Sequence, residues 1–385
     1  MKLSLTRDAL LSALEPAARV TPTKSPMSMV LNVKLVAEGG VLAITGSDLD
    51  MVVIARIPAT IDMPGAITVP ARAFLDLTRR FAPKTTVHLQ ADEELHTLTV
   101  RSGRAKAALH ALSARDYPDI APGDWTSRFT LPAATLSDLI GRTTFAVATN
   151  ETHFYMCGVF LHVVDVGLGP RLRAVAMDGK RMARMDIAAP DGAATMPPVI
   201  LPTKAAEEIV KLAISGDVRV SVSDAKFAAR CAPGGEAADI EIIAKVLDAT
   251  YPDYESIMPH DHGNCLTVAR EPFSEMTARV AALASDQAKA IRFDLAPDSI
   301  TAEARRTISG DILDEVDADY AGVEMSVGLQ SRYVRDLCTA FSSVHICGRF
   351  GGPMELTLWT EKDGGPLLIL IAPLAVGPAE AREAA

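Results

Sequence analysis

The sequence predicts an α+β protein of three similar domains, each with two helices packed on antiparallel sheets. A helix-start signal followed by a periodic apolar run begins at Pro70, at Pro202 and at Gln330, with spacings of about 130 residues. That period has the size of a whole domain, because solenoid repeats span only about 20–50 residues. Short β-branched runs at close spacing lie between the helices and predict antiparallel strands.

Three further landmarks recur in the same order along the chain. An earlier helix is expected at residues 5–11, 131–136 and 268–273, and a strand with its turn at 44–48, 175–178 and 300–303. A Tyr-Pro-Asp element occurs at 117–119 and again at 251–253, each time after an apolar strand. The shared order of these landmarks indicates domains that repeat one plan.

In the first repeat the expected elements follow one another closely. Strands are expected at 34–37, 41–44 and 51–55, with turns at 38–40 and 46–48. The helix from Pro70 has proline in its first turn, where the missing N–H is tolerated. Its Phe74, Leu77 and Phe81 share one face and should pack on the core. Strands at 87–90, 97–100 and 107–110 complete the repeat.

Clusters of Pro, Gly, Asp and His near residues 125–128 and 260–264 predict the domain boundaries. The expected domains are therefore 1–126, 127–261 and 262–376. Residues 377–385 follow the last apolar run and are expected to form a disordered tail.

The composition argues against several classes of protein. The 385 residues are 49% hydrophobic and carry a formal charge of −10. No run approaches the ~18 consecutive apolar residues of a membrane span, and the N-terminus lacks an apolar signal region, so the cytoplasm is the expected location. Five scattered cysteines without a C-x-x-C pair argue against a disulfide framework, and no cofactor or metal is predicted.

Basic residues recur at two matching positions of the second helix of each repeat, although the chain as a whole is acidic. These positions hold Arg72 and Arg79, then Lys204 and Lys211, and finally Arg332 and the uncharged Thr339. One interpretation is the ordinary solvation of helix surfaces. The other is a series of phosphate contacts, which would bind DNA without sequence preference, respond to salt and permit sliding.

Five short motifs occur in an informative order: Thr45-Gly46-Ser47-Asp48-Leu49-Asp50-Met51, Val69-Pro70-Ala71-Arg72, Val100-Arg101-Ser102-Gly103-Arg104, Asp178-Gly179-Lys180-Arg181-Met182-Ala183 and Tyr251-Pro252-Asp253-Tyr254. With their spacing, they make the chain resemble the β subunit of bacterial DNA polymerase III, the sliding clamp, from Met1 to about Val376. The resemblance implies three DNA-clamp domains per chain and a head-to-tail dimer that closes a six-domain ring. It also implies a non-catalytic role, in which the ring encircles duplex DNA and gives the polymerase processivity.

The resemblance places DNA-facing positions at Lys24, Arg72, Arg79, Asn150, Phe154, Tyr155 and Lys204. The recurrence of basic residues adds Lys211 and Arg332 to this predicted set. Lys24 belongs to the loop at 21–26, which either extends toward DNA or is an ordinary exposed loop.

The resemblance further implies a groove that accepts short peptides from the polymerase III alpha subunit, the clamp loader delta subunit, other DNA polymerases, ligase and mismatch-repair proteins. The implied groove residues are Met156, Met177, Gly179, Lys180, Arg181, Met182, Pro252, Ile257, Tyr333, Leu370, Ile371, Ala372, Pro373 and Leu374. Methionines would suit an adaptable apolar surface. The alternative is that they fill the core and that Asp178-Gly179 is only a hairpin turn. Repeat one has Asp50 where repeat two has Lys180, which favours one groove per chain.

This sequence departs from the family pattern at Lys180, Ser256 and Ala288, which leaves the peptide preference of the groove open. At the implied dimer interface, Lys106, Ala107 and Leu109 of one chain should meet Ala282 and Leu283 of the other. The pair Arg305-Arg306 leaves the ion-pair pattern of that interface open as well.

Two other functions remain to be weighed. A metal-dependent nucleic-acid enzyme would need a cluster such as His260-Asp261-His262 with Cys265, or the aspartates Asp48, Asp50, Asp178 and Asp186. The first lacks a fourth ligand at zinc spacing, and the second is divided between separate repeats. A monomeric repeat scaffold for proteins is the other alternative. It would show the mass of one chain and no salt-dependent binding to DNA.

Overall fold

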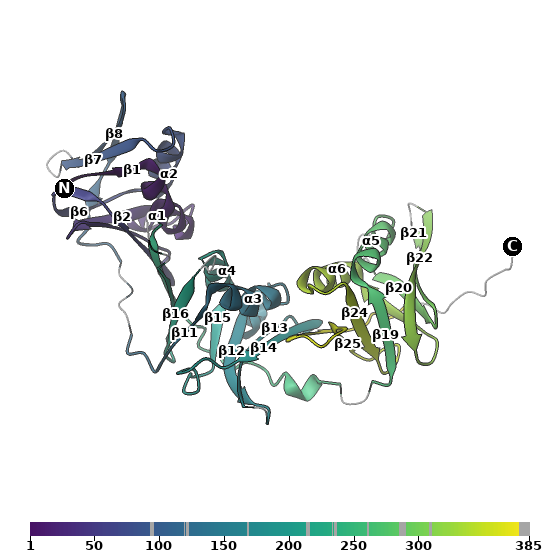
Figure 1. The fold of residues 1–385 in the computed structure, drawn as a ribbon. Coiled ribbons are helices and arrows are strands. Elements are labelled where there is room, and N and C mark those ends of the chain that lie inside the picture. Colours follow the sequence, from purple (N-terminus) through teal and green to yellow (C-terminus); the bar gives the residue numbers. More distant parts are fainter. Residues whose placement is uncertain are drawn as a thin grey trace. The chain divides into compact units, whose positions relative to one another are not determined.

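The computed structural model describes residues 1–92, 96–118, 120, 123–167, 169–212, 216–232, 234, 237–259, 262–284, 290–307 and 310–376 (Figure 1). It contains two compact units: unit 1 comprises Met1–Asp138 and Ala189–Asp248, and unit 2 comprises Leu139–Ala188 and Ala249–Ala385. Both units combine helices with antiparallel sheets, which confirms the α+β prediction. The predicted tail at 377–385 lies outside the described residues.

Unit 1 contains a five-stranded sheet with the order β5-β1-β7-β8-β9. Its strands are β1 (Lys2–Thr6), β5 (Thr60–Met63), β7 (Thr86–Asp92), β8 (Thr97–Ser102) and β9 (Ala105–His110). Strand β9 is the last strand at one side of this sheet.

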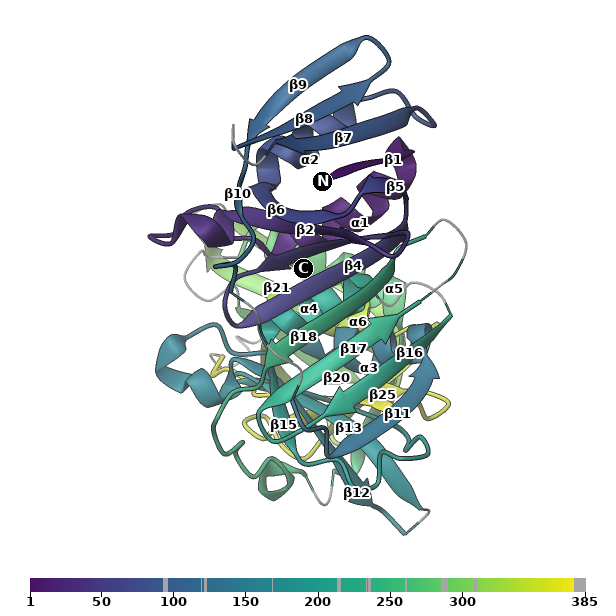
Figure 2. The ribbon, with the colours of Figure 1, turned by 90° about the vertical axis from the view of Figure 1, so that its left-hand side faces the viewer.

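A second, nine-stranded sheet in unit 1 has the order β10-β6-β2-β3-β4-β18-β17-β16-β11. Its strands are β2 (Asn32–Glu38), β3 (Val41–Ser47), β4 (Met51–Pro58), β6 (Gly65–Pro70), β10 (Leu112–Ser113), β11 (Ser127–Pro132), β16 (Asp217–Val222), β17 (Lys226–Cys231) and β18 (Asp239–Lys245). Figure 2 shows β4, β18, β17, β16 and β11 side by side. Strands from the first and second sequence repeats therefore form one continuous sheet.

The helices of unit 1 are α1 (Arg7–Val20), α2 (Ala71–Arg80) and α4 (Thr203–Leu212), with the short η1 (Ser28–Leu31) and the strand β15 (Val199–Pro202) before α4. Helix α1 packs on α2 and on β3 and β4. Gly46 lies under α1, and a Cβ there would be 1.8 Å from the Ala17 carbonyl oxygen. The strand can approach the helix this closely only because residue 46 has no side chain.

Several predicted element ends were wrong by one or two residues. Leu5 and Thr6 belong to β1, and Thr6 caps α1 by accepting a hydrogen bond from the Ala9 N–H at 3.2 Å. Pro70 is the N-cap of α2 and the last residue of β6, rather than a residue of the helix itself. Similarly, Gly46 belongs to β3, and the turn begins at Asp48. In each case the strand ladder extends up to the residue before the helix or turn.

The core of domain one follows the predicted helical face. Phe74 is fully buried in the main hydrophobic cluster of unit 1, and Leu77 and Phe81 pack against that cluster while partly exposed. Arg72 and Arg79 lie on the exposed side of α2. The periodicity of the sequence therefore separated the core face from the basic face correctly.

In unit 2 the strands follow the order β12-β13-β14-β26-β25-β24-β19-β22-β21-β20-β23. They are β12 (Gly158–Asp165), β13 (Pro170–Met177), β14 (Arg181–Ala188), β19 (Asn264–Ala269), β20 (Ala290–Ala296), β21 (Ser299–Thr307), β22 (Gly310–Ala321), β23 (Met325–Gln330), β24 (His345–Phe350), β25 (Thr357–Glu361) and β26 (Leu367–Ile371). The helices are α5 (Arg270–Ala281) and α6 (Ser331–Ala340), with the short η2 (Glu151–Met156) and η3 (Glu255–Ile257). Helix α3 (Ala133–Thr144) begins in the sequence of unit 1 and ends in that of unit 2. Within the described ranges, no helix is long and apolar enough to span a bilayer.

Candidate DNA-facing and partner-binding sites

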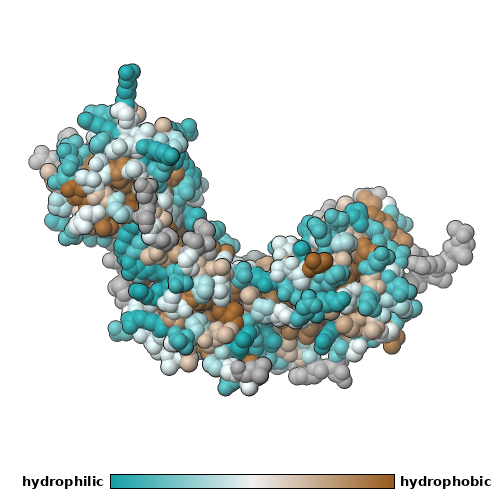
Figure 3. Space-filling model, in the orientation of Figure 1, coloured by the Kyte–Doolittle hydropathy of each residue, from teal (hydrophilic) through white to brown (hydrophobic). Residues whose placement is uncertain are grey.

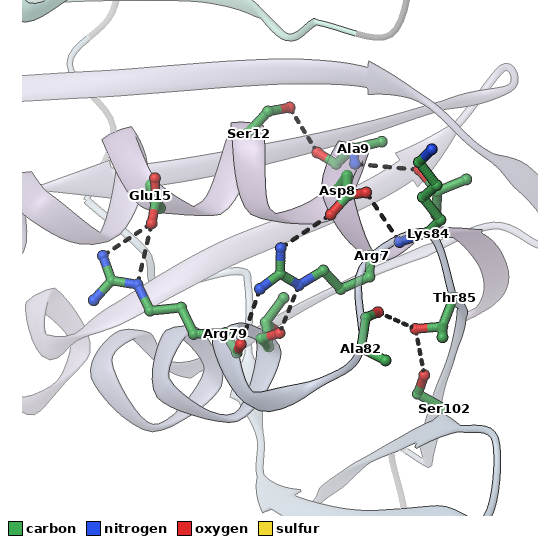
Figure 4. Close-up of polar contacts among 12 residues, drawn as sticks. Arg7, Asp8, Ala9, Ser12, Glu15, Arg79, Ala82, Lys84, Thr85 and Ser102 are labelled. Carbon is green, nitrogen blue, oxygen red and sulfur yellow. Dashed lines mark hydrogen bonds and ion pairs between the residues drawn. The ribbon is translucent and has the colours of Figure 1, made fainter.

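The predicted basic residues of α2 are exposed and already have partners. Arg72 donates from Nη2 to the Thr23 hydroxyl at 2.9 Å, which ties α2 to the loop that carries the exposed Lys24. Arg79 forms an ion pair with Glu15 of α1 at 2.9 Å, as Figure 4 shows. Because both Arg79 and Glu15 are about half exposed, this pair contributes little to stability.

The basic residues of α4 are paired more tightly. Lys204 donates from Nζ to Asp48 at 2.5 Å and to the Val20 carbonyl oxygen at 3.1 Å. Lys211 bonds to Glu208 at 2.9 Å, and the same carboxylate accepts from Arg19 of α1 at 2.6 Å. Glu208 is a buried carboxylate that two cations share, so it binds α1 to α4.

The remaining predicted DNA-facing residues belong to unit 2. Arg332 of α6 is two-thirds exposed and lies 3.6 Å from Asp336, one turn further along the helix. Asn150 caps η2 by accepting from the Thr152 N–H at 3.0 Å. Phe154 of η2 is 53% exposed.

The predicted groove residues gather around a cavity of about 390 Å³ that lies wholly within unit 2. Its walls are Tyr155, Met156, Met177, Gly179, Lys180, Arg181, Met182, Pro252, Asp253, Ile257, Leu356 and Leu370. The surface drawn in Figure 3 is mostly hydrophilic, with hydrophobic atoms in small separate groups. A cavity with mostly apolar walls and a few polar groups is the kind of site that binds ligands.

The residues that line the cavity overlap with the predicted groove set but do not coincide with it. Tyr155, predicted to face DNA, lines the cavity, while Asp253 and Leu356 line it without having been predicted. Tyr333, Ile371, Ala372, Pro373 and Leu374 do not line it. Asp253 could have been found from the recurring Tyr-Pro-Asp element, whereas no sequence signal marks Leu356.

The predicted groove residues that do not line the cavity take part in the strands and hydrogen bonds of unit 2. Ile371 is buried in β26, and the Ala372 N–H donates to the Lys180 carbonyl oxygen at 2.7 Å. The Leu374 N–H bonds to the Gly328 carbonyl oxygen at 2.8 Å. The first bond fixes Ala372 beside the turn that carries Lys180, and the second attaches Leu374 to β23.

The turn at Asp178 explains the Gly-Lys-Arg element. Asp178 accepts from the backbone N–H groups of Lys180 and Arg181 at 2.9 and 3.0 Å, and Gly179 adopts φ 83°. A positive φ of this size favours glycine. The three methionines Met156, Met177 and Met182 are mostly buried yet line the cavity. The core-filler and hairpin interpretation is therefore correct about the packing, and it is compatible with a groove.

Arg181 is the polar centre of the cavity wall. Its side chain is only 4% exposed and bonds to Asp178 at 3.0 Å, to Asp336 of α6 at 2.5 Å and to the Phe145 carbonyl oxygen at 2.6 Å. Its guanidinium lies 4.4 Å from the centre of the Tyr333 ring. Tyr333 therefore holds Arg181 in place. Burial, and then the nearby Asp178, raise the pKa of Tyr333, so its phenol is neutral.

The residues predicted for the dimer interface occupy the surfaces of their units. Lys106 is exposed on β9, and Ala107 and Leu109 are partly exposed on the same edge strand. Ala282 and Leu283 follow the C-terminus of α5 and are also accessible. The side chains of Arg305 and Arg306, and all of Ala288, lie outside the described residues.

The residues weighed for an enzyme site do not form one in the described part of the chain. No group of three metal-binding side chains comes together there, while His260 and Asp261 lie outside it. Each of the four aspartates has a cationic partner: Asp48 binds Lys204, Asp50 binds Lys245, Asp178 binds Arg181 and Asp186 binds Arg173. These carboxylates serve turns and ion pairs.

The chain is similar to one protein family along nearly its whole length. Residues 1–121 match the N-terminal domain of the DNA polymerase III beta subunit, residues 130–253 match its central domain, and residues 255–373 match its C-terminal domain. The beta sliding clamp of Caulobacter vibrioides is 32% identical over 380 residues, covering 98% of this chain and 100% of the relative. That of Escherichia coli strain K12 is 29% identical, covering 90% and 92%.

Solved structures agree with the sequence relatives. The DnaN sliding clamp of Bartonella birtlesii, solved with griselimycin bound, has a TM-score of 0.92 at 30% identity and covers 98% of this chain and all of its own. The Caulobacter crescentus pol III beta structure has a TM-score of 0.90 at 32% identity with the same coverage.

Proposed function

This chain belongs to the DNA polymerase III beta-subunit family, the bacterial sliding clamps, and we propose that it encircles duplex DNA by joining two copies head to tail through β9 and β22. It is a DNA sliding clamp, a non-catalytic processivity factor that acts with DNA and a polymerase as a homodimer. The proposed domains are 1–126, 127–261 and 262–376.

One observation supports this closure: the chain joins its sequence repeats in the same way twice. In unit 1, β4 pairs with β18, and the Lys245 N–H donates to the Asp50 carbonyl oxygen at 2.9 Å. In unit 2, β14 pairs with β26, and the Ala372 N–H donates to the Lys180 carbonyl oxygen at 2.7 Å. Both junctions are antiparallel and have the same register. In each, the N–H donates to the carbonyl oxygen of the residue directly before the first residue of β4 or β14.

A third pair of equivalent edges, β9 and residues 312–317 of β22, pairs with no further strand among the described residues. By the same ladder positions, β9 corresponds to β18 and β26, while residues 310–317 of β22 correspond to β4 and β14. When the strand pairings of the repeats are aligned, Lys106 is equivalent to Glu241 and Leu313 is equivalent to Ile54. Glu241 and Ile54 are directly opposite each other in the β4–β18 pair. Unpaired edge strands are templates for a further strand. Repetition of the register would set Lys106 opposite the partner's Leu313.

Charge on the two edges supports the same register. Within unit 1, Arg56 of β4 forms an ion pair with Glu241 of β18 at 2.9 Å. The equivalent residues at the third junction are Glu315 and Lys106, which form an opposite-charge pair with the signs exchanged. Arg104 would lie directly opposite the partner's Glu315 in this register. Ala107 and Leu109 would bury their apolar side chains against Ala282 and Leu283 of the partner subunit.

We propose that the DNA contacts are weak because acidic side chains lie beside the basic residues that face DNA. Lys24, Arg72, Arg79, Lys204 and Lys211 in unit 1, with Asn150, Phe154, Tyr155 and Arg332 in unit 2, remain the proposed DNA-facing set. Four residues of that set form ion pairs with carboxylates of this chain: Arg79 with Glu15, Lys204 with Asp48, Lys211 with Glu208 and Arg332 with Asp336. Since acidic partners lower the local positive potential, phosphates would be held loosely enough for the ring to slide.

The cavity in unit 2 is the proposed binding site for partner peptides. The polymerase III alpha subunit and the clamp loader delta subunit are the first expected partners, followed by other polymerases, ligase and mismatch-repair proteins. The proposed site also includes Tyr333, Ile371, Ala372, Pro373 and Leu374, which adjoin the cavity. Its methionine-rich walls would adapt to several sequences. We place this activity in the cytoplasm, on the chromosome.

Retention on nicked circular DNA tests the ring directly. The clamp would be loaded by a clamp loader with ATP, washed at a salt concentration that removes ordinary DNA binding, and measured before and after the circle is cut. Release upon cutting is expected from a topological link. Equal retention on circular and linear DNA would refute encirclement and leave direct binding instead.

A further inference from the structure

One wall of the partner cavity has no strand ladder to hold it. The segment from Tyr251 to Met258 supplies Pro252, Asp253 and Ile257 to the cavity. Its described backbone N–H groups bond locally: the Met258 N–H donates to the Glu255 carbonyl oxygen at 3.1 Å, and the Glu255 N–H donates to the Asp253 carboxylate at 3.2 Å. Local bonds shape a turn but do not place it on the protein. Side chains must therefore position this wall.

Arg173 of β13 connects that segment to the sheet. Its side chain is 4% exposed and makes two parallel bonds to Asp186 of β14, each 2.8 Å. The third guanidinium nitrogen, Nη1, donates to the Tyr254 hydroxyl at 3.1 Å and to the Glu255 carboxylate. Burial opposes the charge, but the bonds to Asp186 and Tyr254 outweigh it and raise the pKa of Arg173. The guanidinium therefore stays charged and fully engaged.

Strand β12 completes the attachment through two aromatic side chains. Phe160 stacks on Tyr251 with 4.8 Å between ring centres and 6° between planes, and it also stacks on His162 at 4.5 Å. The Tyr254 hydroxyl lies 2.9 Å from His162 Nε2. Because Arg173 donates to the Tyr254 oxygen, the phenol proton is free to be donated to His162. Burial, and then Arg173, lower the pKa of His162 to about 4, so a neutral imidazole accepts that proton at pH 7.

We propose that Arg173 is a positioning residue for the partner cavity: through Tyr254 and Glu255 it fixes the 251–258 wall at the separation from β13 and β14 that an apolar peptide segment needs. This inference rests on the proposed role of the cavity as the partner site. Arg173 itself does not line the cavity. Its effect on a bound peptide would therefore be indirect, through the position of the wall.

Two variants test the positioning role with griselimycin as the probe, since a clamp of the same fold has been solved with it. Tyr254→Phe keeps the ring and removes the hydroxyl, and it should weaken binding about three- to tenfold. Arg173→Lys keeps the charge, but one ammonium cannot reach Asp186, Tyr254 and Glu255 together, so binding should fall about tenfold or more. In both variants the amides of 251–258 should exchange with solvent faster than in the unaltered protein.

A control variant tests whether changing any Arg–Asp pair between neighbouring strands lowers binding. Arg230 of β17 binds Asp239 of β18 through two nitrogens in the same way, but in unit 1. Arg230→Lys should leave griselimycin binding and the exchange of 251–258 unchanged. Unaltered affinity in Arg173→Lys and Tyr254→Phe, with or without faster exchange, would overturn the inference.

A fourth variant tests the cavity itself. Ile257 lines it and is 43% exposed, so Ile257→Glu places a charge in the cavity without burying one in the core. Loss of griselimycin binding in this variant is expected. Full binding in Ile257→Glu would refute the cavity as the partner site, and the positioning inference would fail with it. Loss in Ile257→Glu with full binding in Arg173→Lys would refute the positioning inference alone.

Discussion

Lys204, near the start of α4, donates from Nζ to Oδ2 of Asp48, 2.5 Å away in the turn between β3 and β4. The other oxygen of Asp48 accepts from the N–H groups of Asp50 and Met51 and so closes the turn. One carboxylate thus has two roles, forming a turn and restraining a lysine proposed to face DNA. The two roles can be separated by substitution.

We predict that Asp48→Asn increases the affinity for linear duplex DNA. The amide oxygen can still accept the turn bonds, but the negative charge beside Lys204 is gone. Fluorescence anisotropy over about 50–200 mM salt should give a steeper plot of log affinity against log salt, with a slope larger by about one. Asp50→Asn is the control, because Asp50 pairs with Lys245 instead. If affinity and slope stayed the same in Asp48→Asn, Lys204 would not be a phosphate contact.

Ring closure predicts a charge-swap rescue. Lys106→Glu should weaken the dimer about five- to tenfold, because it sets a second acid beside the partner's Glu315. Glu315→Lys alone should do the same, and the double variant should recover most of the lost affinity. Sedimentation over a dilution series measures the dimer constant, and Lys2→Glu on β1 controls for the change in net charge. Additive losses in the double variant would contradict the proposed register.

Arg181→Ala should destabilise the protein strongly. It leaves Asp178 and Asp336 without their shared cation and removes the bond to Phe145, a loss of about 3 kcal/mol for unit 2. Thermal unfolding should show a lower transition temperature for this variant. Arg171→Ala removes a hydrogen bond to the Asp186 carbonyl oxygen at 3.2 Å and should cost much less. Equal losses in the two variants would argue against a special role for Arg181.

The low pKa of His162 predicts acid sensitivity. Its folded pKa of about 4 lies below the unfolded value of 6.5, so the unfolded chain binds this proton more readily. The stability that neutral His162 contributes is therefore present above pH 6.5 and is lost as the pH falls toward 4, with a magnitude of about 1–3 kcal/mol. Urea unfolding at several pH values should show a steeper decline for the unaltered protein than for His162→Gln. Parallel declines would mean that other groups dominate.

Gly46→Ala should be severely destabilising. The added Cβ would lie 1.8 Å from the Ala17 carbonyl oxygen, so α1 or β3 must shift, at a cost of about 3 kcal/mol or more. Gly263→Ala is the control, because a Cβ there meets no atom within 4 Å. Urea unfolding of both variants measures the difference. A Gly46→Ala protein as stable as the control would mean that α1 lies further from β3 than described.

The sequence predicted the elements better than their ends. The apolar spacing of Phe74, Leu77 and Phe81 identified the core side of α2, because helical periodicity depends only on nearby residues. It placed Pro70 inside the helix, whereas the residue caps it. Which residue ends a strand depends on the neighbouring strand, and that strand is distant in the sequence.

By itself, the sequence determined the α+β class, the repeated plan and the basic helix faces, since periodicity and turn chemistry are local properties. Most of the cavity residues were identified by the resemblance to the sliding-clamp family. Only the tertiary structure decided that Lys204 pairs with Asp48, that Leu356 completes the cavity and that Arg173 connects its loose wall to the sheet. These contacts join residues far apart in the chain. Their formation depends on strand register and side-chain packing, which one sequence without its fold does not specify.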